Sequence, residues 1–316
     1  MQLQRVRQCG KLTGGDRFMK QRYKGILSLL LATLIWGSTF VAQSVGMDYI
    51  GPFTFQAVRC ALAVIGLLPV IYIADRRSGR SFRKEWANKQ LWLGGLLCAV
   101  PLFLAANLQQ LGIVSTSAGK SAFLTAMYIV IVPILGLFLG RKPSPMVPVS
   151  VVLAVIGLYL LSCVGVTSIQ TGDILLLLCA FMFAVQILFV DRFAPSVDAL
   201  RLNCLQAGFC ASLSGIIAVF IEDIHFPSLL DCWLPLSYAG FLSMGAAYSL
   251  QIVGQKHLEP AAASLIMSLE SVFAVLFGWL LLHETMTVWE TVGCVLVFAA
   301  VILSQINIPA KKKSLK

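Results

Sequence analysis

Charged residues are scarce in this chain of 316 residues. They make up 12% of it, whereas soluble domains contain about 25%. Hydrophobic residues account for 58%, and the mean hydropathy is +0.86. A soluble fold of this length needs many more polar side chains to cover its surface, so a soluble globular domain is excluded. The composition predicts a protein that lies in a lipid bilayer.

Metal-ligand and disulfide patterns are also missing. The nine cysteines are odd in number, contain no CxxC pair and stand mostly inside apolar runs, which predicts small buried side chains. The three histidines, His225, His257 and His283, lie far apart at the ends of expected helices. We therefore expect no metal site and no cofactor.

Ten apolar runs are long enough to cross a hydrocarbon core about 30 Å thick. Turn and charge signals bound them at about residues 25–46, 52–73, 91–111, 118–139, 146–164, 171–190, 199–221, 233–254, 260–282 and 287–307. Pro52, Pro145 and Pro260 fall at expected first helical positions, and Thr287 with Glu290 has capping-box spacing. We predict an all-α polytopic membrane protein with ten transmembrane helices.

The basic residues test this number of helices. With the N-terminus in the cytoplasm, 21 of the 24 lysines and arginines fall in cytoplasmic segments and none in the opposite loops. The other three, Arg59, Lys120 and Arg201, lie within or at the ends of expected helices. We expect both termini in the cytoplasm, in a bacterial inner (plasma) membrane. The net charge of +10 then faces anionic membrane lipid, and no nucleic acid partner is expected.

Two basic tails flank the apolar runs, at residues 1–24 and 308–316, and both are expected in the cytoplasm. Two interpretations of residues 1–18 are equally favoured: a disordered tail, or an artefact of a start codon assigned upstream of the true one. A cleaved signal peptide is disfavoured, since the first run is long and has no A-x-A cleavage site.

A shift of 142 residues aligns the third to fifth runs with the eighth to tenth without a gap, and places Gln109 on Gln251. This indicates two five-helix repeats, at 25–164 and 171–307. Because five is odd, the second repeat must cross the membrane inverted, as in alternating-access transporters. The alternative is that all apolar helices resemble one another, and the gap-free length of the match favours the repeat.

Three strings of residues, together with the five-plus-five arrangement, resemble the EamA branch of the drug/metabolite transporter superfamily. They are WGSTF at 36–40, SAGKSAFLTAMYIVIVPILGLFLGRKP at 117–143 and SLESVFAVLFGWLLLHETMT at 268–287. The resemblance covers about residues 20–307, with two departures: the family's usual Gly-Glu is Gly140-Arg141 here, and its usual Glu-Pro is Glu270-Ser271. It implies a carrier of small metabolites, often outward, with a cavity lined by helices 1–4 and 6–9. It implies no particular substrate.

Glu270 lies about ten residues into the ninth expected helix, near the middle of the membrane, where a carboxylate is costly. It fits a protonatable coupling site, a counter-charge for a cationic substrate, or a structural carboxylate paired with a hydroxyl or basic group. Tyr128 holds the equivalent position in the first repeat, so the two halves present unequal chemistry to the centre.

Arg59 lies about two turns into the second expected helix, and Lys120 begins the fourth. Either could attract an anionic or zwitterionic substrate, or extend to the outer interface with its stem along the helix. We favour a cavity role for Arg59 and the interface for Lys120.

Further polar and aromatic residues could line a substrate cavity, or could pack between helices. On the first expected helix, Trp36, Thr39 or Phe40, and Gln43 share one face, which suits an amino-acid-like or organic-cation ligand. The other candidates are Asn107, Gln109 and Gln110 on the third helix, Gln186 and Gln206 on the sixth and seventh, and Tyr248 and Gln251 on the eighth.

We expect a secondary transporter of small organic solutes, an exporter by resemblance, with proton coupling left open; no Walker motif supports ATP drive. An intramembrane lipid-modifying enzyme would need clustered Asp or His residues, and Glu222-Asp223 with His225 fits a solvated loop better. A channel or structural membrane protein is disfavoured by the inverted repeat. Small-residue faces would permit a homodimer.

Overall fold

The computed structural model describes residues 14–116, 118–141, 143–162, 170–282 and 286–306. These residues form helices joined by short connections, with no strand among them. The predicted C-terminal tail, the first part of the N-terminal tail and His283 lie outside the described residues.

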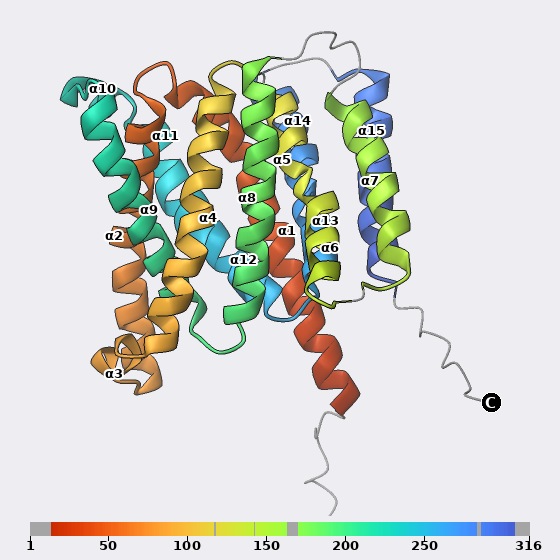
Figure 1. Ribbon diagram of the computed structural model, residues 1–316, viewed down its shortest axis with the longest axis horizontal. Coiled ribbons are helices and arrows are strands. Elements are labelled where there is room, and N and C mark those ends of the chain that lie inside the picture. The colour runs from red at the N-terminus through yellow and green to blue at the C-terminus, as the bar shows by residue number, and fades with distance from the viewer. Residues whose placement is uncertain (1–13, 117, 142, 163–169, 283–285, 307–316) are drawn as a thin grey trace, which may run out of the picture.

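Figure 1 shows most of the long helices running between the same two faces of the molecule. In chain order the elements are α1 (Gly14–Gly46), α2 (Pro52–Ser78), α3 (Phe82–Trp86), α4 (Lys89–Ile113), α5 (Ala118–Ala126), α6 (Tyr128–Phe138), α7 (Met146–Ser162), α8 (Thr171–Phe193), α9 (Ala199–Ile221), α10 (Phe226–Asp231), α11 (Trp233–Ser237), the π-helix η1 (Tyr238–Ala247), α12 (Tyr248–Gln255), α13 (Pro260–Met267), α14 (Leu269–Leu282) and α15 (Val288–Ser304).

Seven helical segments are long and apolar enough to cross a membrane: 19–46, 52–78, 89–113, 119–138, 171–193, 199–221 and 260–280. Two shorter apolar helices, α7 and α15, lie at two further predicted runs. The remaining run, 233–254, corresponds to α11, η1 and α12 in succession. The fold is therefore all-helical with several membrane-spanning segments.

Local signals explain most helix ends. Pro52 and Pro260 stand at helix starts, and the predicted capping box forms, with Glu290 N donating to Thr287 Oγ1 at 3.2 Å and Thr287 N to Glu290 Oε2 at 2.6 Å. Pro145 lies one residue before α7. At the other extreme, α1 begins at Gly14, so residues 14–24, expected in a tail, extend the first helix.

The 222–225 segment is a loop in which Asp223 and His225 are exposed, as expected, but Glu222 is half-buried and has a structural role. Its carboxylate accepts hydrogen bonds from the backbone N–H groups of Phe53 and Thr54, both at 2.8 Å, and from Thr54 Oγ1 at 2.6 Å. The first N–H groups of a helix have no partner within the helix, so this carboxylate caps α2 from the end of α9.

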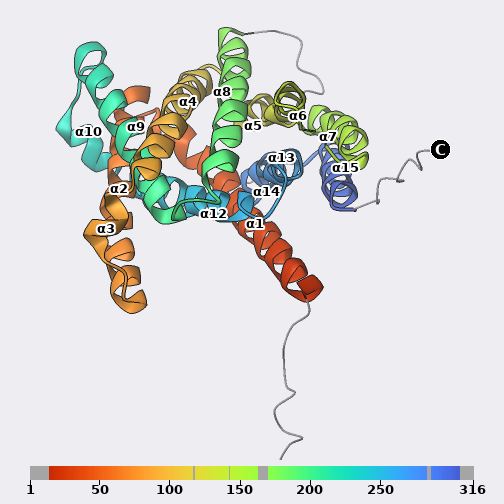
Figure 2. The same cartoon turned by 60° about the horizontal axis from the view of Figure 1, so that its bottom comes forward.

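Close helix packing depends on glycine at equivalent places in the two halves. A Cβ at Gly112 of α4 would lie 2.6 Å from Leu176 Cγ of α8, and one at Gly254 of α12 would lie 2.6 Å from Leu29 Cγ of α1. These distances are far below van der Waals contact, so the absence of a side chain permits both approaches. Figures 1 and 2 show α7 and α15 as a separate pair at one side, where a Cβ at Gly157 would meet Gly293 O at 2.9 Å.

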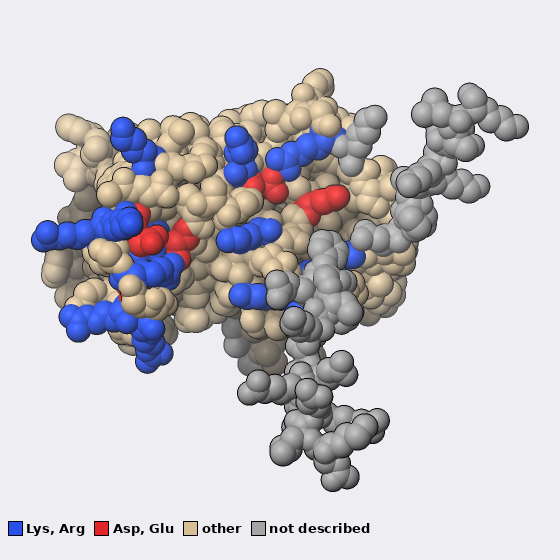
Figure 3. Space-filling view, turned by 90° about the horizontal axis from the view of Figure 1, so that it is seen from below, with Lys and Arg blue, Asp and Glu red and all other residues tan. Residues whose placement is uncertain are grey.

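Lysine and arginine side chains gather on the face at the bottom of Figure 1, seen directly in Figure 3. Two basic side chains form close ion pairs: Arg141 with Asp191 at 2.5 Å, and Arg201 with Asp75 in the buried interior. Burial lowers the pKa of His257 on this face, and the nearby Lys24 and Lys256 lower it further. Its imidazole is therefore neutral near pH 7.

The seven cysteines within the described residues are free and buried, as the sequence predicts. They fill apolar contacts between helices.

Candidate functional site

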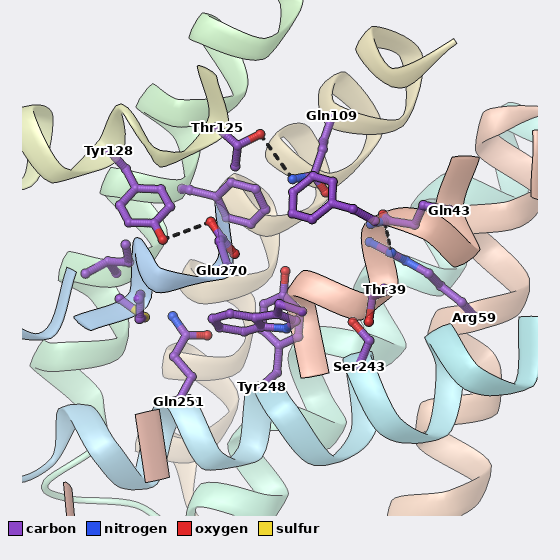
Figure 4. A pocket seen from close by; sticks show the side chains of 15 residues that line it. Thr39, Gln43, Arg59, Gln109, Thr125, Tyr128, Ser243, Tyr248, Gln251 and Glu270 are labelled. Atoms are coloured by element: carbon purple, nitrogen blue, oxygen red, sulfur yellow. Dashed lines mark hydrogen bonds between the residues drawn. The ribbon is translucent and has the colours of Figure 1, made fainter. Parts of the chain in front are cut away.

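A central cavity lies where the membrane-spanning helices are interrupted. It has a volume of about 40 Å³ and is lined from α1, α2, α4, α5, α6, α8, η1, α12, α13 and α14 (Figure 4). Nine of the predicted site residues line it: Trp36, Thr39, Gln43, Arg59, Gln109, Tyr128, Tyr248, Gln251 and Glu270. Residues far apart in the sequence thus meet in one space.

Two helix interruptions place the central acid and its partner. One separates α5 from α6 at Met127, and the other separates α13 from α14 at Ser268. Ser268 Oγ donates to Leu265 O at 2.8 Å, a bond that competes with regular helix geometry. Tyr128 therefore begins α6, and Glu270 lies in the first turn of α14, where the helix N-terminus stabilises negative charge.

Tyr128 and Glu270 contact each other directly. Tyr128 Oη donates a hydrogen bond to Glu270 Oε1 at 2.9 Å, and both side chains are buried (Figure 4). The two residues are 142 positions apart, which is the shift that aligns the two predicted repeats. This hydrogen bond agrees with the interpretation of Glu270 as a carboxylate paired with a hydroxyl group. Because Glu270 also lines the cavity, the other two interpretations, a coupling site and a counter-charge, stay open.

Arg59 lies at the other end of the cavity in Figure 4. Its guanidinium is 2% exposed and donates from Nη1 to Gln43 Oε1 at 2.7 Å. Its Nε finds no hydrogen-bond partner, and no ion pair joins it to Glu270, within the described part of the chain. Because a buried cation without a carboxylate partner is costly, this group is available to an anionic ligand.

Lys120 has a different environment. Its ammonium lies 2.6 Å from Asp173 Oδ2, at the capping box that begins α8. It does not line the cavity. Lys120 therefore joins α5 to α8 through an ion pair, and its position at the outer interface stays a prediction.

Aromatic rings separate the charged groups. Trp36 and Tyr248 meet edge to face, with ring centroids 5.0 Å apart, and Phe183 adds a third ring to the lining. Edge-to-face rings offer an apolar surface as well as a π-face for a cation.

Four predicted site residues do not line the cavity. Asn107 donates to Phe103 O at 2.7 Å and to Ser214 Oγ at 2.9 Å, and Gln110 donates to Gln43 O at 3.3 Å. Gln186 and Gln206 are fully buried and bond to each other at 3.3 Å. Gln110 and Gln186 thus hydrogen-bond to the lining residues Gln43 and Gln251, whereas Asn107 and Gln206 bond to residues outside the lining.

Phe40, predicted with Thr39 on one face of the first helix, also lines the cavity. Five further lining residues were not predicted: Thr125, Phe183, Ile187, Ser243 and Met267. Thr125 could have been found, since it precedes Tyr128 by one turn and accepts from Gln109 Nε2 at 3.2 Å. Met267 is its equivalent after the shift of 142 residues. Ser243 lies in η1, whose π-helical spacing is not apparent from the sequence.

The arrangement can bind a small ligand and carries no evident metal centre. Within the described residues, no three His, Cys, Asp or Glu side chains are grouped to hold a metal ion. The lining instead offers a cation, an acid, amides and aromatic rings, which suits noncovalent recognition of a polar organic molecule.

Comparison with known proteins identifies the family. A sequence profile of the EamA-like transporter family matches the chain twice, over residues 23–163 and 170–305. An uncharacterized transporter of Archaeoglobus fulgidus is 31% identical over 299 residues, which cover 94% of this chain and 91% of the relative. The uncharacterized transporter YoaV of Bacillus subtilis is 22% identical, covering 92% and 99%.

A solved crystal structure shares the fold. It superposes with a TM-score of 0.72 at 17% identity and covers 90% of this chain and 96% of its own. Together with the apolar helices, the profile matches show that the chain belongs to the EamA-like transporter family and is a multi-pass membrane transporter.

Proposed function

We propose that the protein is a secondary active transporter that carries small zwitterionic solutes, such as amino acids, by alternating access, and that it has no enzymatic activity. The observation that supports this most directly is the placement of the Arg59 guanidinium and the Glu270 carboxylate in one buried cavity. Each charge has a neutral hydrogen-bond partner, Gln43 or Tyr128.

A zwitterion satisfies both ends of the cavity. Its carboxylate fits the guanidinium of Arg59, and its ammonium group fits the carboxylate of Glu270. The side chain of the solute would lie against Trp36 and Tyr248. A buried charge is favourable only when paired, so a ligand with both charges is preferred over one that satisfies a single end.

Alternating access requires two halves that move relative to each other, and we propose ten transmembrane helices in two inverted five-helix repeats. The double match of the family profile and the equivalent approaches at Gly112 and Gly254 support this. The gathering of basic side chains on one face supports a cytoplasmic position for that face, and with it for both termini, in a plasma membrane. We propose outward transport from the resemblance to the family.

Glu270 is our candidate coupling group. It is buried, it faces the cavity, and its hydrogen-bond donor Tyr128 comes from the opposite half. A proton that binds this carboxylate would compete with the ammonium group of the solute. Exchange of one for the other would couple outward movement of the solute to inward movement of protons.

The test uses purified protein in proteoliposomes that contain one L-amino acid at a time, from leucine, phenylalanine and threonine. We expect counterflow of at least one of them, stimulated by an imposed pH gradient. Glu270→Gln should lower the pH-stimulated rate by about tenfold or more, because a charge-assisted bond and the titrating group are both lost. Glu259→Gln, an exposed glutamate before α13, is the matched control and should leave the rate unchanged.

Two results would contradict the proposal. Absence of counterflow for all three amino acids would contradict the substrate class. Equal stimulation of wild type and Glu270→Gln by the pH gradient would exclude Glu270 as the coupling group, and the substrate class would stand.

A further inference from the structure

Buried amides connect one wall of the cavity to the π-helix η1. Gln251, which lines the cavity, donates from Nε2 to Gln186 Oε1 at 3.1 Å. Gln186 donates to Gln206 Oε1 at 3.3 Å, and Gln206 donates to Asn203 Oδ1 at 2.9 Å. All four side chains are at most 2% exposed. They form one hydrogen-bonded chain of amides through α12, α8 and α9, which we call the amide chain.

The direction of the amide chain is set at its far end. Asn203 Nδ2 lies 2.9 Å from the carbonyl oxygens of Met244 and Gly245, and 2.9 Å from Ser249 Oγ. A backbone carbonyl accepts hydrogen bonds and cannot donate them. The nitrogen of Asn203 must therefore face η1, and its oxygen must face Gln206.

This constraint passes from one amide to the next. Because Asn203 presents an oxygen, Gln206 must donate to it and turn its own oxygen to Gln186. By the same argument Gln186 presents its oxygen to Gln251. Gln251 then uses its nitrogen, and its oxygen is left for the cavity, where it has no hydrogen-bond partner within the described residues. Figure 4 shows Gln251 on the same side of the cavity as Glu270.

We propose that the amide chain makes Gln251 Oε1 a fixed acceptor that selects an N–H donor on the substrate. This deepens the proposed function and rests on it: the ammonium group of the zwitterion would bind Glu270 and Gln251 Oε1 together. A glutamine free to turn could present either its oxygen or its NH₂ group, and would accept an amine or a carbonyl at that position. Because the orientation of Gln251 is fixed, a ligand carbonyl at the same position would place its oxygen against Gln251 Oε1, and two acceptors would face each other without a proton between them.

Gln186, Gln206 and Asn203 are therefore positioning residues, which act through Gln251 without touching the substrate. Sites with an oriented, unpaired polar group discriminate strongly against ligands that fail to pair with it. The preference for an N–H donor over a carbonyl should therefore depend on the direction of the hydrogen bonds in the amide chain. If these residues only supported the packing of the helices, that direction would not matter.

The experiment compares amino acids with the matching 2-oxo acids, in which a carbonyl replaces the C–H and ammonium group. The probes are L-leucine, L-phenylalanine and L-threonine with their 2-oxo analogues, and dissociation constants are measured on the purified full chain from ligand-induced thermal shifts. Wild type should prefer at least one amino acid over its 2-oxo acid by about tenfold or more.

Variants at position 206 separate direction from packing. Gln206→Leu interrupts the amide chain, so Gln186 and Gln251 can turn, and the preference should fall about three- to tenfold. Gln206→Glu keeps an oxygen toward Gln186 in either protonation state, and should retain the wild-type preference within about twofold. Gln255→Leu is the control, because Gln255 is a buried amide of α12 that bonds to Ile187 O, outside the amide chain. It should change stability and leave the preference intact.

Gln186→Leu interrupts the amide chain one step nearer the cavity and replaces Gln206→Leu if that variant does not fold. An unchanged preference in both leucine variants would overturn this inference and leave the proposed function standing. Absence of binding of all three amino acids to wild type would overturn both. A loss of preference in Gln206→Glu equal to that in Gln206→Leu would also overturn it, since packing and not direction would then be responsible.

Discussion

The two halves that match the family profile, residues 23–163 and 170–305, share their packing but not their chemistry. Gly112 permits α4 to approach α8, and Gly254 permits α12 to approach α1. At each glycine an added Cβ would lie 2.6 Å from a leucine Cγ of the neighbouring helix. At the centre, however, Tyr128 of the first half faces Glu270 of the second. The helix framework therefore tolerates a duplicated pattern, whereas the cavity depends on the differences between the copies.

The amides show the same contrast. Gln109 of the first half bonds to Thr125 at 3.2 Å, and its equivalent Gln251 begins the amide chain through Gln186. A symmetric pair of amides in the sequence thus becomes two different groups in the structure. Unequal walls suit an unsymmetrical ligand, in agreement with the proposed zwitterion.

The largest effect is expected from exchanging the central pair. Tyr128→Glu alone should abolish transport and lower the unfolding free energy by about 3 kcal/mol, because two buried carboxyl groups replace a hydrogen-bonded pair. The double variant Tyr128→Glu/Glu270→Tyr restores one donor and one acceptor, and should recover about 1–3 kcal/mol of that loss. Thermal unfolding in detergent measures the cycle, and additive single effects would mean that the pair does not interact.

Filling the two glycine contacts should have the next largest effect. Gly112→Val and Gly254→Val should each destabilise the protein by about 1–3 kcal/mol or more, because the added atoms overlap a leucine and a backbone carbonyl. The midpoint of thermal unfolding measures both. Gly119→Val is the control, since nothing lies within 4 Å of its Cβ position. Unequal effects at 112 and 254 would break the equivalence of the two halves.

The third prediction concerns the equivalent residues Thr125 and Met267, which both line the cavity. Thr125→Val removes the acceptor for Gln109 and should cost about 1 kcal/mol. Met267→Leu keeps an apolar side chain of similar volume and should cost less. The midpoints of thermal unfolding of the two variants measure this difference. A lower midpoint for Met267→Leu than for Thr125→Val would contradict the prediction.

The smallest effect is expected at an exposed ion pair between the two halves. Arg141 stands where the family usually has glutamate, and it pairs with Asp191 at the rim of the basic face, with 42% of its side chain exposed. Arg141→Ala should change the unfolding free energy by less than about 1 kcal/mol, because solvent screens the pair. A shift in unfolding midpoint as large as that of the glycine variants would assign this ion pair a structural role.

Much of the architecture could be predicted because it depends on local patterns. Apolar runs bounded by proline and charge located the long helices, and the spacing of Thr287 and Glu290 predicted a capping box that forms. The π-helix η1, which packs against α1 and α2, could not be predicted, since no local sequence pattern marks its π-helical spacing. Glu222 was misinterpreted for a related reason: its partners lie at the start of α2, about 170 residues away.

The sequence by itself determined that the chain is a membrane protein, where its long apolar helices lie, and that a few polar residues stand within them, because hydrophobic content and periodicity are local properties. It also placed Tyr128 and Glu270 at equivalent positions. Only the tertiary structure decided that these two residues touch, that Arg59 faces the same cavity, and that Gln186 and Gln206 stand behind its wall. The physical reason is that side-chain contacts between helices depend on rotation and depth in three dimensions. A hydrophobic pattern constrains those quantities only loosely when every helix is apolar on most of its faces.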